Sequence, residues 1–214
     1  GVEVNITMGG EMMQETLWTL MLSAAFFCAT MTMTPGPNNI LLTQSGANYG
    51  VKRTLPHVLG IRAGQTSLHI AMLLGLGSLF ESWPLLHQIL RVLSIGYLVY
   101  LAYRISTSSV SEQVNQEESK PMTFKEAAFF QLINPKSWMA TITLCSAFTI
   151  SGDAYWLSGL LGVLVYNLVG FPASFTWVCL GSAIRNLLNS AKRRSYFNWT
   201  MGFLLLLTIP LIVR

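Results

Sequence analysis

The sequence predicts an all-α integral membrane protein: six transmembrane helices form two inverted three-helix repeats, and helices 1 and 4 are broken by proline. Three observations lead to this fold class, namely a scarcity of charge, long apolar stretches, and a prolyl break that opens each half. Of the 214 residues, 52% are hydrophobic and 10% charged, and the mean hydropathy is +0.49. This composition offers too little polar surface for a soluble globular domain.

The predicted spans are the stretches that supply the roughly 20 apolar residues needed to cross the hydrocarbon core. They cover residues 16–34 with a continuation over 40–47, then 55–80, 85–105, 124–150, 155–183 and 197–213. The most polar stretch separates the third span from the fourth. We therefore expect an N-terminal segment outside the membrane at 1–15, a first repeat at 16–105, a cytoplasmic linker at 106–123 and a second repeat at 124–214.

The distribution of basic residues predicts the orientation, because Lys and Arg near short loops are retained on the cytoplasmic side. Alternate loops carry Lys52, Arg53, Arg104, Lys120, Lys125, Arg185, Lys192, Arg193 and Arg194. The remaining loops hold Glu81, with Arg91 nearby, and Asp153. Both termini are thus expected outside. The net charge of +4 is explained by basic loops that face anionic lipid, so no nucleic-acid partner is expected.

Enzyme and metal signatures are missing from the sequence. Cys28, Cys145 and Cys179 each lie within an apolar span, and their spacing matches no metal motif. The sequence contains neither a G-x-S-x-G elbow nor an H-E-x-x-H pair. We expect no catalytic residue, metal or cofactor. An intramembrane enzyme, a channel and an assembly subunit without coupled transport stay open as alternatives.

The first break carries the most informative chemistry. It consists of Thr34, Pro35, Gly36, Pro37, Asn38 and Asn39. Proline donates no backbone hydrogen bond and clashes with the preceding turn, so carbonyl oxygens before the break lose their helical partners. Gly36 is expected to adopt backbone angles closed to other residues. Free carbonyls persist in a membrane only where they face protein or a water-filled cavity.

A second break at Asn134 and Pro135 opens the other half, followed by Lys136 and preceded by Gln131. Three spans lie in each half, so the second copy must enter the membrane from the opposite side. The helix N-terminus after each break suits a carboxylate, and the freed carbonyls suit an ammonium group. A zwitterionic amino acid fits such a site. The simpler interpretation is that each proline only kinks a membrane helix.

Arg62 and His69 are the ionisable groups at depth, seven residues apart in the second span. His69 can change charge near neutral pH, and Arg62 can hold a carboxylate. Two other interpretations stay open. Arg62 can extend to the cytoplasmic interface, and His69 can hydrogen-bond a neighbouring helix.

At the two breaks the sequence resembles the LysE/RhtB superfamily of amino-acid exporters. The match rests on T-P-G-P-N at residues 34–38 and on N-P-K at residues 134–136, and it extends over nearly the whole chain in span count and spacing. The form P-G-P-N-N-I-L at residues 35–41 looks most like the branch that exports cysteine and O-acetylserine.

The resemblance implies export of amino acids or close derivatives, driven by proton antiport, by a homodimer in the plasma (inner) membrane, which would place both termini on the periplasmic side. With the breaks, it assigns substrate binding to Thr34, Pro35, Gly36, Pro37, Asn38, Asn39, Gln131, Asn134, Pro135 and Lys136, with Arg62 and His69 as coupling or carboxylate contacts. The expected partners are an amino acid, protons and the lipid bilayer. Neither break contains an acid, so the proton carrier is not evident from the sequence.

Overall fold

The computed structural model describes residues 9–108 and 120–212. Most of the predicted N-terminal segment 1–15 and of the linker 106–123 therefore lies outside the described residues. The described chain is helical and contains no strand. Its elements are α1 (Gly10–Met33), α2 (Pro37–Leu73), α3 (Leu76–Ser82), α4 (Pro84–Ser106), α5 (Phe124–Ile133), α6 (Pro135–Ala147), η1 (Gly152–Ala154), α7 (Tyr155–Ile184), η2 (Arg185–Leu187), α8 (Ala191–Leu207) and α9 (Ile209–Ile212).

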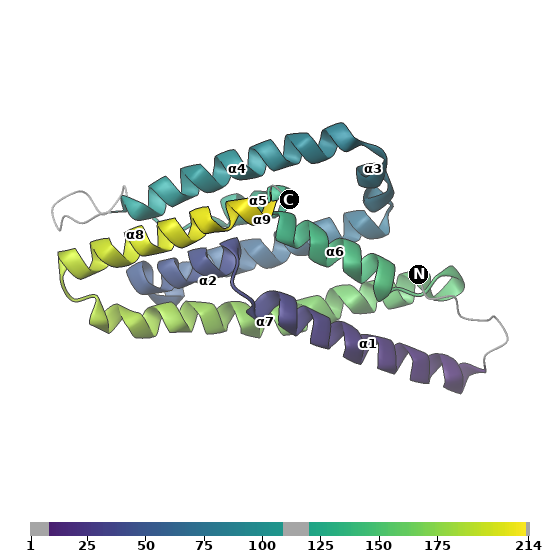
Figure 1. Cartoon of the computed structure of the whole chain (residues 1–214). Coiled ribbons are helices and arrows are strands. Elements are labelled where there is room, and N and C mark those ends of the chain that lie inside the picture. The colour runs from purple at the N-terminus through teal and green to yellow at the C-terminus, as the bar shows by residue number, and fades with distance from the viewer. Residues whose placement is uncertain (1–8, 109–119, 213–214) are drawn as a thin grey trace.

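The helices form an elongated bundle in which most of them run along its length (Figure 1). Helices α2 and α7 form the centre and pack against each other. Helix α2 also contacts α5 and α6, whereas α1 packs along α7 and α4 packs along α8. The two prolyl breaks lie between α1 and α2 and between α5 and α6. Both are thus held against the central α2 and α7 pair.

Several helices meet the length and composition needed to cross a membrane. They are the stretches Gly10–Met33, Pro84–Ser106, Gly152–Leu187 and Ala191–Ile212, and the pair Pro37–Leu73 with Leu76–Ser82 qualifies if it is taken as one bent span. The predicted fourth span is divided into α5 and α6, of 10 and 13 residues, and neither piece is long enough alone. A multi-pass arrangement follows, while the count of six spans stays a prediction.

The boundaries of the first two spans differ from the prediction. Helix α2 joins the end of the first predicted span to the second, with one non-helical residue, Gly50, at φ 80°. The second predicted span is not one straight helix. Helix α2 ends at Leu73, Gly75 adopts φ 112°, and α3 departs at 77°. A positive φ is open to glycine at little steric cost, so these glycines set the two turns.

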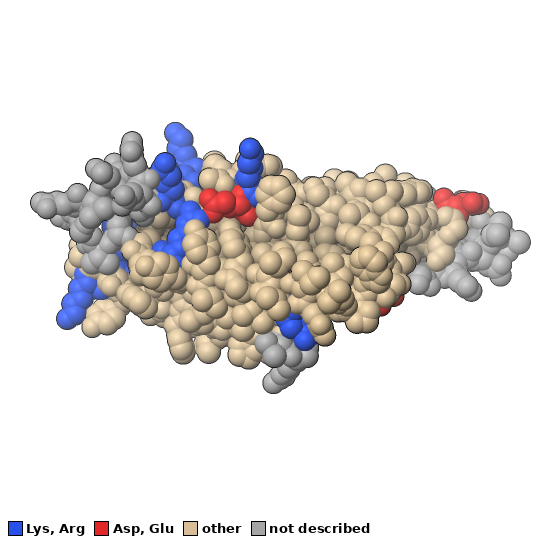
Figure 2. Space-filling view, turned by 90° about the horizontal axis from the view of Figure 1, so that it is seen from above, with Lys and Arg blue, Asp and Glu red and all other residues tan. Residues whose placement is uncertain are grey.

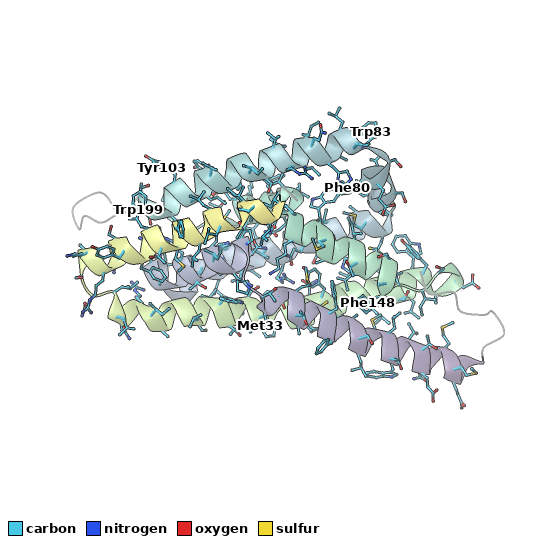
Figure 3. The ribbon with its side chains drawn as sticks, in the orientation of Figure 1. Met33, Phe80, Trp83, Tyr103, Phe148 and Trp199 are labelled. Atoms are coloured by element: carbon cyan, nitrogen blue, oxygen red, sulfur yellow. The ribbon has the colours of Figure 1, made fainter. Side chains whose placement is uncertain are left out.

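The outer faces of the bundle are apolar and its interior is partly polar, the reverse of a soluble protein. Phe26 is 78% exposed, whereas Gln131 and Asn198 are fully buried. Exposed aromatic residues lie toward both ends, with Tyr103 and Trp199 at one end and Trp83 at the other (Figure 3). Aromatic residues at the two interfaces and apolar residues between them are the pattern that a bilayer selects.

Most of the Lys and Arg in view gather toward one end of the molecule, with a smaller number near the middle of its edge (Figure 2). Contacts tie the predicted basic loops together at that end. Gly50 lies against the Arg185 guanidinium, and Asn48 hydrogen-bonds Asn198 across the gap between α2 and α8 at 2.8 Å. Basic loops that alternate along the sequence thus lie together at one end of the bundle.

Close approach of backbones holds α2 against α7. A Cβ atom on Gly46 would lie 2.2 Å from the Val178 carbonyl oxygen, and one on Gly181 would lie 2.0 Å from the Thr43 carbonyl oxygen. Gly60 of α2 meets α5 in the same way, because a Cβ on Gly60 would lie 2.4 Å from the Phe124 carbonyl oxygen. Small residues of this kind let membrane helices gain packing contacts along their backbones.

Replacing Gly181 by alanine is therefore expected to separate α2 from α7 and to lower the free energy of unfolding by about 1–3 kcal/mol, as overpacking does. The matched control is Gly96→Ala in α4, where a Cβ meets nothing within 4 Å. That change should be neutral or stabilising by up to about 1 kcal/mol. Thermal unfolding in detergent measures both, and equal melting temperatures for the two variants would contradict the packing argument.

Candidate functional site

The two breaks differ in length but start their second helices in the same way. Residues 34–36 are non-helical in the first break, and Pro37 is the first residue of α2. In the second break a single residue, Asn134, is non-helical, and Pro135 is the first residue of α6. Proline suits this position, because the first helical N–H has no partner within the helix. The Asn134 side chain caps α6 by accepting from the Lys136 N–H at 3.2 Å.

Side chains from both halves satisfy the carbonyl oxygens that the first break frees. Asn39 Nδ2 donates to the carbonyl oxygens of Thr32 and Thr34 at 2.9 and 2.7 Å. Lys136 Nζ, from the other half, donates to the Thr34 carbonyl oxygen at 2.8 Å and to Thr34 Oγ1 at 2.9 Å. The carbonyl oxygens at this break were predicted to receive the ammonium of a substrate. In this structure the Lys136 ammonium binds that of Thr34 instead.

Gly36 serves a different purpose from the one predicted. Its φ of −177° and ψ of 179° describe an extended backbone that any residue adopts. A Cβ at this position would lie 3.0 Å from both Cδ and Nζ of Lys136. A larger residue here would displace the lysine side chain, which crosses directly over the backbone.

Gln131 connects the two breaks through a buried amide network. It exchanges a pair of hydrogen bonds with the Asn38 side chain, at 2.8 and 3.0 Å. Its Oε1 also accepts from Ser137 Oγ at 2.7 Å, and Gln65 Nε2 donates to the same hydroxyl at 2.9 Å. Buried polar groups are stable in this way only when each has a partner. The network therefore fixes α2, α5 and α6 relative to one another.

Arg62 extends this network toward α7. The residue is only 5% exposed, and its guanidinium donates to Gln65 Oε1 and to the Tyr166 carbonyl oxygen. It lies 5.0 Å from the centre of the Tyr166 ring. Gly170 makes room for it, since a Cβ there would lie 1.9 Å from Arg62 Nη1. The guanidinium is thus held in the interior and does not extend to the cytoplasmic interface.

These groups line a small cavity between the breaks. Its volume is about 30 Å³, which is room for about two water molecules. The lining residues are Met31, Thr32, Gly36, Asn38, Asn39, Ile61, Arg62, Gln65, Asn134, Lys136, Ser137, Ala140, Tyr166 and Ser174. Figure 3 shows Met33, at the end of α1, near the middle of the molecule.

The cavity includes five of the ten predicted binding residues. Gln131 does not line the cavity but hydrogen-bonds Asn38, which does. Thr34, Pro35, Pro37 and Pro135 shape the backbone around the cavity. Sequence reasoning missed Gln65, Tyr166 and Ser174. Gln65 lies three residues from Arg62, so helical spacing alone places both on one face. Tyr166 and Ser174 have no comparable signal, because only the packing of α7 against α2 brings them to the cavity.

His69 lies outside this cavity. Its ring is buried, its centre is 6.1 Å from that of Tyr166, and neither ring nitrogen has a hydrogen-bond partner among the described residues. The alternative that His69 bonds a neighbouring helix through its ring is therefore not observed. The described part of the chain also holds no cluster of three His, Cys, Asp or Glu side chains that could bind a metal ion.

The family model described as LysE type translocator matches residues 29–210. The chain belongs to the LysE family. The match covers both breaks and every residue that lines the cavity, so the resemblance noticed at the breaks extends across the fold. Membership of a translocator family makes the chain a membrane transporter and removes the intramembrane enzyme as an alternative.

Curated relatives of this LysE protein carry the same name in two enterobacteria. The "Cysteine/O-acetylserine efflux protein" of Shigella flexneri is 30% identical over 182 residues, which cover 82% of this chain and 90% of the relative. The protein of that name from Escherichia coli (strain K12) is 30% identical over 179 residues, covering 81% and 89%. No solved structure matches the chain significantly.

Replacing Gln131 by methionine tests the amide network of this LysE protein. An interhelical hydrogen bond in a membrane averages about 0.6 kcal/mol, but a buried polar group left without a partner costs about 1–3 kcal/mol. We expect the larger loss, because Gln131→Met removes both hydrogen bonds to the part-buried Asn38 amide. The exposed Gln88→Met is the control. Melting temperatures in detergent should fall for Gln131→Met alone, and a similar fall in both variants would argue against the network.

Proposed function

We propose that this LysE protein exports small neutral amino acids, such as cysteine or O-acetylserine, from the cytoplasm by proton antiport with alternating access. The observation that carries the proposal is the buried Arg62 guanidinium, which lines the cavity and has no acidic partner among residues 9–108 and 120–212. The ion pair found among the described residues joins Arg104 to Glu126, at 2.5 Å, near the basic end. A buried charge is costly unless it is paired, so Arg62 is suited to receive a carboxylate from a ligand.

The helix ends around the cavity complement a zwitterion. The C-terminal carbonyls of α1 carry partial negative charge and suit an ammonium group, whereas the N-termini of α2 and α6 carry partial positive charge and suit a carboxylate. Asn38 and Asn134 add amide donors and acceptors at the same place. An α-amino acid has both charges within reach of these ends. The names of the relatives from Shigella flexneri and Escherichia coli support a small, uncharged side chain.

Alternating access is consistent with the size of the cavity. A volume of about 30 Å³ holds water but no amino acid, so substrate entry requires the halves to separate. We assign the halves to two inverted three-helix repeats that together cross the membrane six times. The packing supports this, because the second helices of the two halves, in α2 and α7, contact each other, as do the third helices α4 and α8. Rocking of the repeats about the breaks would open each side in turn.

The same family assignment supports a proposal for the assembly and its location in the cell. We propose a homodimer in the inner membrane, with both termini on the periplasmic side. The gathering of Lys and Arg at one end of the molecule supports this orientation, because that end would be retained in the cytoplasm (Figure 2).

Arg62→Gln should abolish saturable flux of labelled L-cysteine in proteoliposomes, because it removes the carboxylate partner but keeps an amide in the network. Arg62→Lys should retain part of the flux, with a KM raised about tenfold or more, since lysine lacks the bidentate geometry. The control is Arg91→Gln in α4, for which no shared contact with the cavity is found. Wild-type rates in Arg62→Gln would refute carboxylate binding by this residue, and flux that ignores the pH gradient in the wild type would refute antiport.

Single cysteines test the orientation in a variant without the three native cysteines. One variant carries Ser151→Cys, in the exposed segment before α7. The other carries Asn189→Cys, in the exposed segment before α8 at the basic end. A maleimide that does not cross membranes should label intact cells at position 151 and not at position 189. Labelling that is restricted to position 189 would reverse the proposed topology.

A further inference from the structure

Lys136 is a charged group whose role in the proposed transport is not explained by substrate binding at Arg62. Its ammonium lies in the cavity wall, bonded to the Thr34 carbonyl oxygen at 2.8 Å, to Thr34 Oγ1 at 2.9 Å and to the Pro35 carbonyl oxygen at 3.5 Å. No carboxylate lines the cavity, and no ion pair to Lys136 is present in the described residues. The positive charge is held by backbone and hydroxyl oxygens alone.

The place that this ammonium occupies is the end of α1, where free carbonyls attract positive charge. Lys136 itself belongs to the first turn of α6, the end of a helix that disfavours a cation. The side chain therefore leaves its own helix and takes the cation site of another. The ammonium of an amino-acid substrate, with its carboxylate on Arg62, would require that same site.

We propose that Lys136 couples proton and substrate transport, because its ammonium and that of the substrate compete for the carbonyl oxygens of Thr34 and Pro35. This inference rests on the proposed amino-acid export. When Lys136 is protonated, the site is taken and the two breaks are joined. When it is neutral, the site is free for the substrate. Substrate and proton thus exclude each other, which is the condition for exchange of one for the other.

The proton balance of one cycle is simple. On the cytoplasmic side Lys136 gives its proton to water and the zwitterion binds with its own ammonium intact. On the periplasmic side a proton from water returns to Lys136 Nζ, the ammonium forms, and the substrate is displaced. One proton enters as one neutral zwitterion leaves. The cycle carries one positive charge inward, so a membrane potential that is negative inside should accelerate export.

Other titratable and charged groups near Lys136 do not take this place. Arg62 of α2 lines the cavity but stays protonated, and Tyr166 of α7 lies beside it. Cys28 of α1 packs in a core cluster with Tyr166 and does not line the cavity. On α5, Lys125 and Glu126 lie in the first turn, away from the break at its other end. His69 lies outside the cavity.

The test compares exchange with coupled transport, using labelled L-cysteine in reducing buffer and reconstituted full-length protein. Lys136→Gln keeps a hydrogen-bond donor but cannot exchange a proton. We expect this variant to exchange labelled for unlabelled cysteine at a rate that is independent of pH, and to lose accumulation driven by a pH gradient. Lys136→Arg, which stays charged, should lose both activities. The exposed Lys125→Gln should retain both.

A binding measurement on the wild type applies even if a Lys136 variant fails to fold. Competition predicts that the apparent Kd for cysteine rises by up to about tenfold per pH unit as the pH falls from about 8 to about 6, and that substrate binding releases protons into weak buffer. In His69→Gln this pH dependence should persist. A pH-independent Kd in the wild type would overturn the coupling inference, as would gradient-driven accumulation by Lys136→Gln.

The outcomes separate this inference from the function on which it rests. If the wild type neither binds nor exchanges cysteine, the proposed export of this substrate class fails. If the wild type exchanges cysteine and accumulates it under a pH gradient, but Lys136→Gln does so equally, export stands and only the role of Lys136 is lost. Loss of coupling in His69→Gln alone would assign the proton to that histidine.

Discussion

The contact between the Lys136 ammonium and the carbonyl oxygen of Thr34, at 2.8 Å, is the interaction on which the centre of this molecule depends. A membrane helix that breaks at depth must find partners for its free carbonyls, since lipid offers none. Asn39 satisfies part of this need from the same half of the chain, and Lys136 supplies the rest from the other half. The hydrogen bonds at this break thus come from both halves of the chain. They connect the two halves at the point where the first helix is interrupted.

Close packing of the central helices supports that contact. Glycines at positions 46 and 181 bring α2 against α7, and Gly170 leaves the space that the Arg62 guanidinium occupies. Gln65 then links Arg62 to the amide network of Gln131 and Asn38. The arrangement places a cation, the positive ends of two helices and the negative end of a third around a cavity of about 30 Å³. Binding chemistry and closure of the bundle therefore depend on the same contacts.

Much of the site could be predicted because proline and its neighbours act locally. Pro37 and Pro135 each begin a helix, as their backbone chemistry requires, and Asn134 caps one. The role of Gly36 could not be predicted, since it depends on a lysine 100 residues later in the chain crossing its backbone. Tyr166 and Ser174 were missed for the same reason. The bend after Leu73 was not predicted, because hydropathy does not register a single glycine at φ 112°.

The sequence by itself determined that the chain lies in a membrane, where its helices break, and which loops carry positive charge. These properties follow from composition and from the covalent limits of proline, and they need no partner. Only the tertiary structure decided that the two breaks face each other, that Arg62 lies in the interior, and that Lys136 covers the carbonyls of Thr34 and Pro35. Such contacts join residues far apart in the chain, so they exist only once α2 and α7 have packed.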